Sequence, residues 1–176
     1  MTVLPLLYKG AGPGTHWHLN DARLSGFTSA ANGVANRNAV VRHIVAYSHP
    51  SPLVSLTSSF AVAREYAISG PAGWATKAAP GFIYEIDLSM LSGSKVFDPI
   101  LMVVKKALSH MHSGAQDLIL AVAQNLPFVP CHHAGGKALP PTVPQELRAL
   151  VYALRDAEVL APVVPSACVV NRHNVH

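Results

Sequence analysis

Apolar and polar positions repeat with two different periods along the chain, and these periods predict which segments are helices and which are strands. Segment 36–47 carries apolar residues at 40, 41, 44 and 45, the spacing of one buried helical face. Segment 81–88 (GFIYEIDL) alternates instead, with Phe82, Tyr84 and Ile86 on one side. The first segment is therefore predicted to be a helix, and the second a strand with one face in polar surroundings.

The same patterns extend over the rest of the chain. They predict further strands at 2–8, 53–57, 158–160 and 168–171, and further helices at 58–68, 99–111, 114–126 and 145–154. Segment 18–27 is expected to be a loop or one short helix, and segment 127–144 a long loop. With no repeat and no linker, residues 1–176 are expected to form one domain. The fold class is α/β (α+β), with helices flanking a strongly bent mixed sheet.

The composition excludes several classes of protein. Half of the residues are hydrophobic and 12% are charged, so a disordered chain is not expected. No apolar run approaches the ~20 residues that span a bilayer. The first ten residues lack the features of a Sec signal. The expected location is outside the producing cell by another route of delivery, or otherwise the cytoplasm, with no membrane association. The formal charge of +4 comes from dispersed residues and suits attraction of phosphates better than a nucleic-acid stripe.

Nine acidic residues are few enough to consider one by one as a catalytic carboxylate. Most occupy positions with an ordinary structural role: Glu65, Glu85, Asp87, Asp98, Asp117 and Glu146. Asp156 and Glu158 differ, because they lie two residues apart at the predicted entrance to a strand, which would put both side chains on one face. Such a pair suits stabilisation of a sugar cation with proton removal from a nearby nucleophile. A solvent-facing strand edge is the alternative.

Hydroxyl side chains gather at the end of the predicted strand 53–57. Ser55 and Thr57 alternate onto one face of this strand, whereas Ser58 and Ser59 are expected to cap the following helix. Hydroxyls in this position can hydrogen-bond a carboxylate or fix a ligand.

Together these segments resemble the ADP-ribosyltransferase toxins, in particular the arginine–serine–glutamate branch that includes the catalytic subunits of pertussis and cholera toxins. Leu7-Tyr8-Lys9 is similar to the family's strand ending in Tyr-Arg, and Ser55-Leu56-Thr57 is similar to its Ser-Thr-Ser motif. Asp156-Ala157-Glu158 is similar to the third motif, a Glu two residues after a Gln or Glu, and residues 81–86 to the family's YIYEV strand. The resemblance covers nearly the whole chain, in the family's order.

The resemblance implies an enzyme that breaks the nicotinamide–ribose bond of NAD, its co-substrate. Glu158 would hold the ribose 2′-hydroxyl and stabilise the oxocarbenium-like centre, while Ser55 would orient Glu158 or the ribose. Asp156 would position or deprotonate the attacking group. Lys9 would contact ribose or phosphate, although it stands where the family has arginine and lacks the planar guanidinium fork. Asp156 likewise departs from the family's Gln or Glu.

The rest of the expected NAD site comes from residues close to these motifs: Tyr8, Gly10, His16 and Thr57. Arg23, Arg42 or His16 could supply contacts that Lys9 does not. The acceptor of ADP-ribose is open: a protein, a nucleic acid or a small molecule makes the protein a transferase, and water makes it an NAD glycohydrolase. A toxin or effector of this kind would have an immunity protein as a possible partner.

Histidines and cysteines do not indicate a metal site. Side chains of the adjacent Cys131, His132 and His133 diverge, which does not suit a tetrahedral site. His173 and His176 are expected in a frayed tail. No metal is therefore predicted.

Two other classes of function remain open. The first is a non-catalytic NAD- or nucleotide-binding module. In such a module Lys9 and Asp156 would be substitutions that accompanied the loss of catalytic activity. A small nuclease that uses His with Lys, suggested by the sequence pI of 9.3, would depend on His16 or His133 and not on Glu158.

Overall fold

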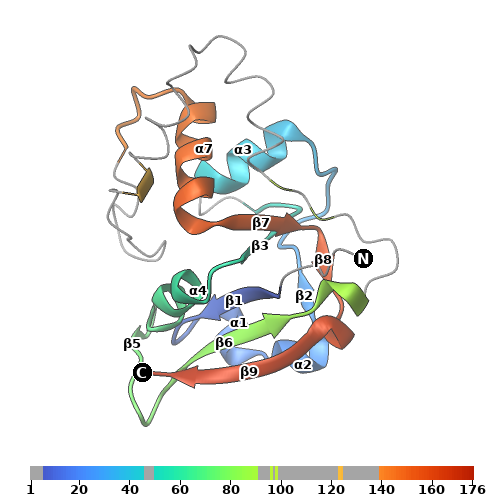
Figure 1. Ribbon diagram of the computed structural model, residues 1–176, viewed down its shortest axis with the longest axis vertical. Coiled ribbons are helices and arrows are strands. Elements are labelled where there is room, and N and C mark those ends of the chain that lie inside the picture. The colour runs from blue at the N-terminus through green and yellow to red at the C-terminus, as the bar shows by residue number, and fades with distance from the viewer. Residues whose placement is uncertain (1–5, 46–49, 91–95, 97, 99–122, 125–138) are drawn as a thin grey trace.

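The computed structural model describes residues 6–45, 50–90, 96, 98, 123–124 and 139–176, and its centre is a five-stranded sheet in the order β7-β3-β1-β6-β9 (Figure 1). The strands are β1 (Leu7–Ala11), β3 (Val54–Thr57), β6 (Gly81–Ile86), β7 (Glu158–Ala161) and β9 (Val169–Val175). Every pairing between them is antiparallel. The α/β class is confirmed. The expectation of a mixed sheet is wrong, because the five strands are all antiparallel to their neighbours.

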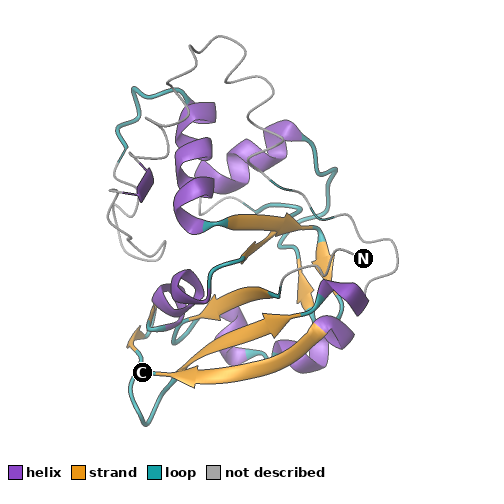
Figure 2. Ribbon diagram, viewed as in Figure 1, coloured by secondary structure: helices purple, strands orange, loops and turns teal. Residues whose placement is uncertain are grey.

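Helices pack on both faces of this sheet (Figure 2). They are α1 (His16–Leu19), α2 (Ala22–Ser25), α3 (Arg37–Val45), α4 (Phe60–Ala67) and α7 (Gln145–Asp156), with 3-10 turns η1 (Leu88–Met90) and η2 (Ser166–Cys168). Two small sheets pair β2 (Phe27–Thr28) with β8 (Val163–Val164), and β4 (Ser69–Gly70) with β5 (Gly73–Trp74). No helix in the described part of the chain is long and apolar enough to cross a membrane.

The two faces of the sheet carry separate apolar cores, because side chains alternate along each strand. Leu56 and Tyr84 face the core that includes Phe27 of β2. Leu160 points to the opposite face and packs with α3 and α7, and Ile83 packs there against α4. The sheet is therefore covered on both sides. This is why Ile83, expected on the polar face of its strand, is fully buried.

The helices begin where capping side chains allow. Asn36 Oδ1 accepts a hydrogen bond of 3.0 Å from the backbone nitrogen of Ala39 in the first turn of α3. Ser59 caps α4, because its Oγ accepts a hydrogen bond of 3.3 Å from the backbone nitrogen of Val62. Both helices are thus confirmed, with Ser59 as the cap of the second.

Two predictions for the helices need a different comment. Segment 18–27 was expected to form a loop or one short helix. It contains the end of α1 and the whole of α2. The predicted helices 99–111 and 114–126, and most of the predicted loop 127–144, lie outside the described residues.

The last strand is longer than the sequence predicted. β9 continues through His173, which was expected in a frayed tail. His173 Nε2 lies 2.8 Å from Glu85 Oε1 on β6. Arg172 Nη1 lies 3.1 Å from Oδ2 of Asp21, the residue that precedes α2. The His173–Glu85 contact and the Arg172–Asp21 ion pair fasten β9 to its neighbours.

Replacing Asp21 with Asn is expected to destabilise the fold by about 1 kcal/mol at neutral pH, the upper range for exposed ion pairs. The hydrogen bond from Arg23, outweighing the opposing effect of burial, holds the pKa of the Asp21 carboxyl below 3.8. When folding lowers the pKa of a carboxyl group, that group stabilises the fold at pH values above its pKa in the unfolded chain. The stabilisation is lost as the pH falls through its pKa in the folded protein. Urea unfolding of both proteins at neutral pH and well below pH 3.8 measures the difference. A difference that persists in acid contradicts a charge effect.

Candidate functional site

Pairing of β3 with β7 brings together Ser55 and Glu158, the two residues expected at the centre of the site. The register joins Thr57 to Glu158 and Ser55 to Leu160, and cross-strand partners point to the same face. Ser55 Oγ donates a hydrogen bond of 2.7 Å to Glu158 Oε1, across 103 residues of sequence. Glu158 is only 9% exposed. Its carboxylate is thus largely removed from water and held by Ser55.

His43 of α3 adds a third group, which the sequence analysis did not assign to the site. Its Nε2 lies 2.6 Å from Ser55 Oγ. A serine hydroxyl carries one hydrogen, and Ser55 donates it to Glu158, so Nε2 of His43 carries the hydrogen in the other contact. The result is a His43–Ser55–Glu158 chain in which both hydrogens point toward the carboxylate.

The order of this chain differs from that of a serine hydrolase triad. In a triad the histidine lies between serine and acid, and accepts the serine proton as the nucleophile attacks. Here Ser55 lies in the middle and gives its hydrogen to Glu158. Ser55 is thus a hydrogen-bond donor to the Glu158 carboxylate and is not arranged as the nucleophile of such a triad.

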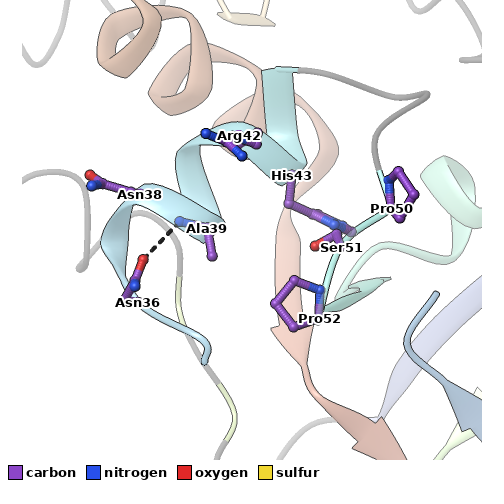
Figure 3. Close-up of a pocket in the computed structure, with 8 residues that line it drawn as sticks. All are labelled: Asn36, Asn38, Ala39, Arg42, His43, Pro50, Ser51 and Pro52. Carbon is purple, nitrogen blue, oxygen red and sulfur yellow. Dashed lines mark hydrogen bonds between the residues drawn. The ribbon is translucent and has the colours of Figure 1, made fainter. Parts of the chain in front are cut away.

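A pocket of about 260 Å³ opens beside His43, and Figure 3 shows this side chain reaching from α3 toward Ser51. The lining comes from the start of α3 and the segment before β3: Asn36, Asn38, Ala39, Arg42, His43, Pro50, Ser51 and Pro52. These residues offer amide, guanidinium, imidazole and hydroxyl donors and no carboxylate. The volume is below the ~300–1,000 Å³ typical of a site that encloses a whole small ligand. The pocket suits one polar or anionic group of a larger ligand.

Asp156 lies in a different setting from the one expected. α7 continues through Asp156, and Ala157 turns the chain with a φ of 46° before β7 begins at Glu158. The two acids do not alternate along one strand, so the argument that they share a face is wrong. Asp156 is 6% exposed, and its Oδ1 accepts a hydrogen bond of 2.6 Å from Arg155 Nε.

Tyr8 and Lys9 point to opposite faces of β1. Lys9 shares the face of Leu7, whose side chain belongs to the core under α2. Tyr8 is in register with Thr57, which is in register with Glu158. The structure brings Tyr8, and not Lys9, to the face that carries Glu158.

Of the other residues expected to bind NAD, Thr57 is the cross-strand partner of Glu158, whereas Gly10 packs against α4 and His16 begins α1. A Cβ at Gly10 would lie 2.1 Å from the carbonyl oxygen of Ala63 in α4, so the close packing of this helix requires glycine. His16 begins α1, where its ring meets Trp17 edge-to-face on the opposite side of the sheet. Thr57 Oγ1 donates a hydrogen bond of 2.6 Å to the backbone oxygen of Asp156.

Of the cations considered as substitutes for the family's arginine, Arg42 is the one that borders the pocket. Arg23 is held by Asp21, with Nη2 and Oδ2 2.6 Å apart, next to α2 on the other face. Arg42 is therefore the positive charge that the structure places next to His43.

Among the described residues, no three His, Cys, Asp or Glu side chains come together in a way that could hold a metal ion. Cys131, His132 and His133 lie outside these residues.

No protein-family model, no curated protein and no solved structure matches this chain.

Proposed function

We propose that the protein is an NAD-dependent ADP-ribosyltransferase, with an ADP-ribosyltransferase-like fold and Glu158 as its catalytic carboxylate. The observation that carries this proposal is the hydrogen bond from Ser55 to the buried Glu158, which joins two segments of the family resemblance. The antiparallel sheet with helices on both faces is compatible with such a fold.

A single buried carboxylate suits the nicotinamide–ribose bond for a chemical reason. Nicotinamide is attached through a positively charged ring nitrogen and leaves as a neutral molecule, so its departure needs no general acid. Hydrolysis of an ordinary glycoside instead uses two carboxyl groups, one of which protonates the leaving oxygen. Asp156, the acid nearest Glu158 in sequence, is ion-paired with Arg155. This asymmetry favours a pyridinium leaving group.

The proposed chemistry follows from the hydrogen bonds around Glu158. Its carboxylate accepts a hydrogen bond from the 2′-hydroxyl of the nicotinamide ribose. The negative charge of the carboxylate stabilises the oxocarbenium-like centre as nicotinamide departs. His43 and Ser55 direct two hydrogens toward this carboxylate and so keep it oriented. Arg42 and the pocket at the start of α3 offer donors for a phosphate of NAD, in place of Lys9.

Replacing Ser55 with Ala is expected to slow nicotinamide release about 10- to 100-fold, because a hydrogen bond to a charged group contributes about 1.5–3 kcal/mol. The assay measures free nicotinamide from labelled NAD. Ser25→Ala is the matched control, since the Ser25 hydroxyl is exposed on α2 and bonds only backbone oxygens there. Equal rates for the two variants would contradict a role for Ser55.

The same labelled NAD, with and without cell lysate, decides the reaction. Label on a macromolecule identifies a transferase, and free ADP-ribose alone identifies an NAD glycohydrolase. Binding without turnover indicates a non-catalytic module. Cleavage of RNA or DNA without NAD turnover would reject the proposal in favour of a nuclease.

A further inference from the structure

Asp156 belongs to a buried network that joins three elements at the turn before Glu158. Its Oδ1 accepts from Arg155 Nε at 2.6 Å, and its Oδ2 accepts from the hydroxyl of Tyr66 on α4 at 3.0 Å. Its backbone oxygen accepts from Thr57 Oγ1 on β3 at 2.6 Å. The end of α7 is thereby tied to α4 and β3.

The Asp156 carboxylate is committed to these partners. The side chains of Arg155 and Asp156 are 5% and 8% exposed. Burial by itself lowers the pKa of the Arg155 guanidinium, but the hydrogen bonds and charge of Asp156 outweigh it and raise this pKa above its ordinary value. A buried charge that loses its partner is strongly unfavourable. Both oxygens of the Asp156 carboxylate are therefore already occupied by hydrogen bonds within the protein.

The turn that follows Asp156 determines where Glu158 points. Ala157 adopts the left-handed conformation, which is unfavourable for a residue with a Cβ by about 1–2 kcal/mol. Its carbonyl oxygen accepts a hydrogen bond of 3.0 Å from the backbone nitrogen of Ser58. Glu158 comes directly after this strained residue, so the position of the Asp156 anchor sets the direction of the Glu158 side chain.

We infer that Asp156 is a positioning residue, which acts with Tyr66 to hold the α7–β7 turn so that Glu158 meets Ser55. The inference rests on the proposed function, in which Glu158 acts on NAD. It gives Asp156 no contact with the acceptor and no part in proton transfer. The choice of acceptor then belongs to other groups.

The test uses Tyr66→Phe, because removing Asp156 itself would leave Arg155 uncompensated and could unfold the protein. The variant deletes one hydroxyl and keeps the ring. Its kcat for nicotinamide release should fall about tenfold with the KM for NAD unchanged, the pattern of an interaction that matters only in the transition state. Tyr84→Phe is the matched control. It deletes a hydroxyl that donates a hydrogen bond of 2.8 Å to the backbone oxygen of Trp17 on the opposite face of the sheet, and its kcat should equal that of the wild type.

A second readout does not depend on turnover. The carboxyl carbon of Glu158 in NMR spectra should shift in Tyr66→Phe and not in Tyr84→Phe, even if the protein proves not to cleave NAD. An unchanged Glu158 signal together with an unchanged kcat overturns the inference. Loss of transfer to an acceptor with unaltered nicotinamide release also overturns it, because that result assigns Asp156 and Tyr66 to the acceptor.

Discussion

Glu158→Gln should lose about a thousandfold in the rate of nicotinamide release, as expected when the main electrostatic support of a charged transition state is removed. Glutamine keeps the shape of the side chain, and its amide oxygen can still accept the hydrogen bond from Ser55. The negative charge is lost. Binding of NAD should therefore change little while kcat collapses, and steady-state kinetics combined with calorimetric binding separate the two quantities.

Glu85→Gln provides the matched control for this prediction. Glu85 is a partly buried glutamate on the same face of the sheet, and it bonds His173 at 2.8 Å. Its neutralisation should leave nicotinamide release intact. If Glu158→Gln retained more than about a tenth of the wild-type rate, equal to a loss of under 1.4 kcal/mol, Glu158 would not be the catalytic carboxylate.

Asp156→Ala should destabilise the protein by about 3–5 kcal/mol, the range observed when one partner of a buried ion pair is removed. Arg155 would keep its charge in a site that is 5% exposed, without the carboxylate that compensates it. The hydroxyl of Tyr66 would lose its acceptor as well. Urea unfolding at neutral pH measures the free energy directly.

The double variant Arg155→Met with Asp156→Leu separates charge from packing. Replacing both partners of a buried pair by apolar side chains of similar volume is often neutral or stabilising. The double variant should therefore recover most of the lost stability. A double variant as unstable as Asp156→Ala would show that packing, and not the unpaired charge, causes the loss.

Local patterns were sufficient to predict the elements that carry Ser55 and His43. The alternation in 53–57 and the apolar spacing in 36–47 identify β3 and α3, because each reflects one buried face. His43 could also have been found as a candidate. It follows Val40 by three residues and precedes Ile44, both buried, so it lies at the edge of the apolar face.

The contacts between elements could not be predicted in this way. That His43 meets Ser55 depends on how α3 lies on the sheet, which no local period specifies. The face of Lys9 depends on the register of β1 against β3, given by the pairing of Tyr8 with Thr57. Asp156 was misplaced because the helix ends at an alanine in the left-handed conformation, whereas glycine is the residue that ordinarily signals such an ending.

Strands β7 and β9 form the two edges of the sheet, although they follow the three central strands in the chain. The central strands can pair with one another before either edge is added. Contact between Ser55 and Glu158 then requires closure of a loop of 103 residues, and contacts of such high sequence separation form slowly because their loop entropy is lost first. Under the proposed function, the site is therefore incomplete until β7 docks beside β3, so acquisition of activity should report directly on the formation of this edge of the sheet.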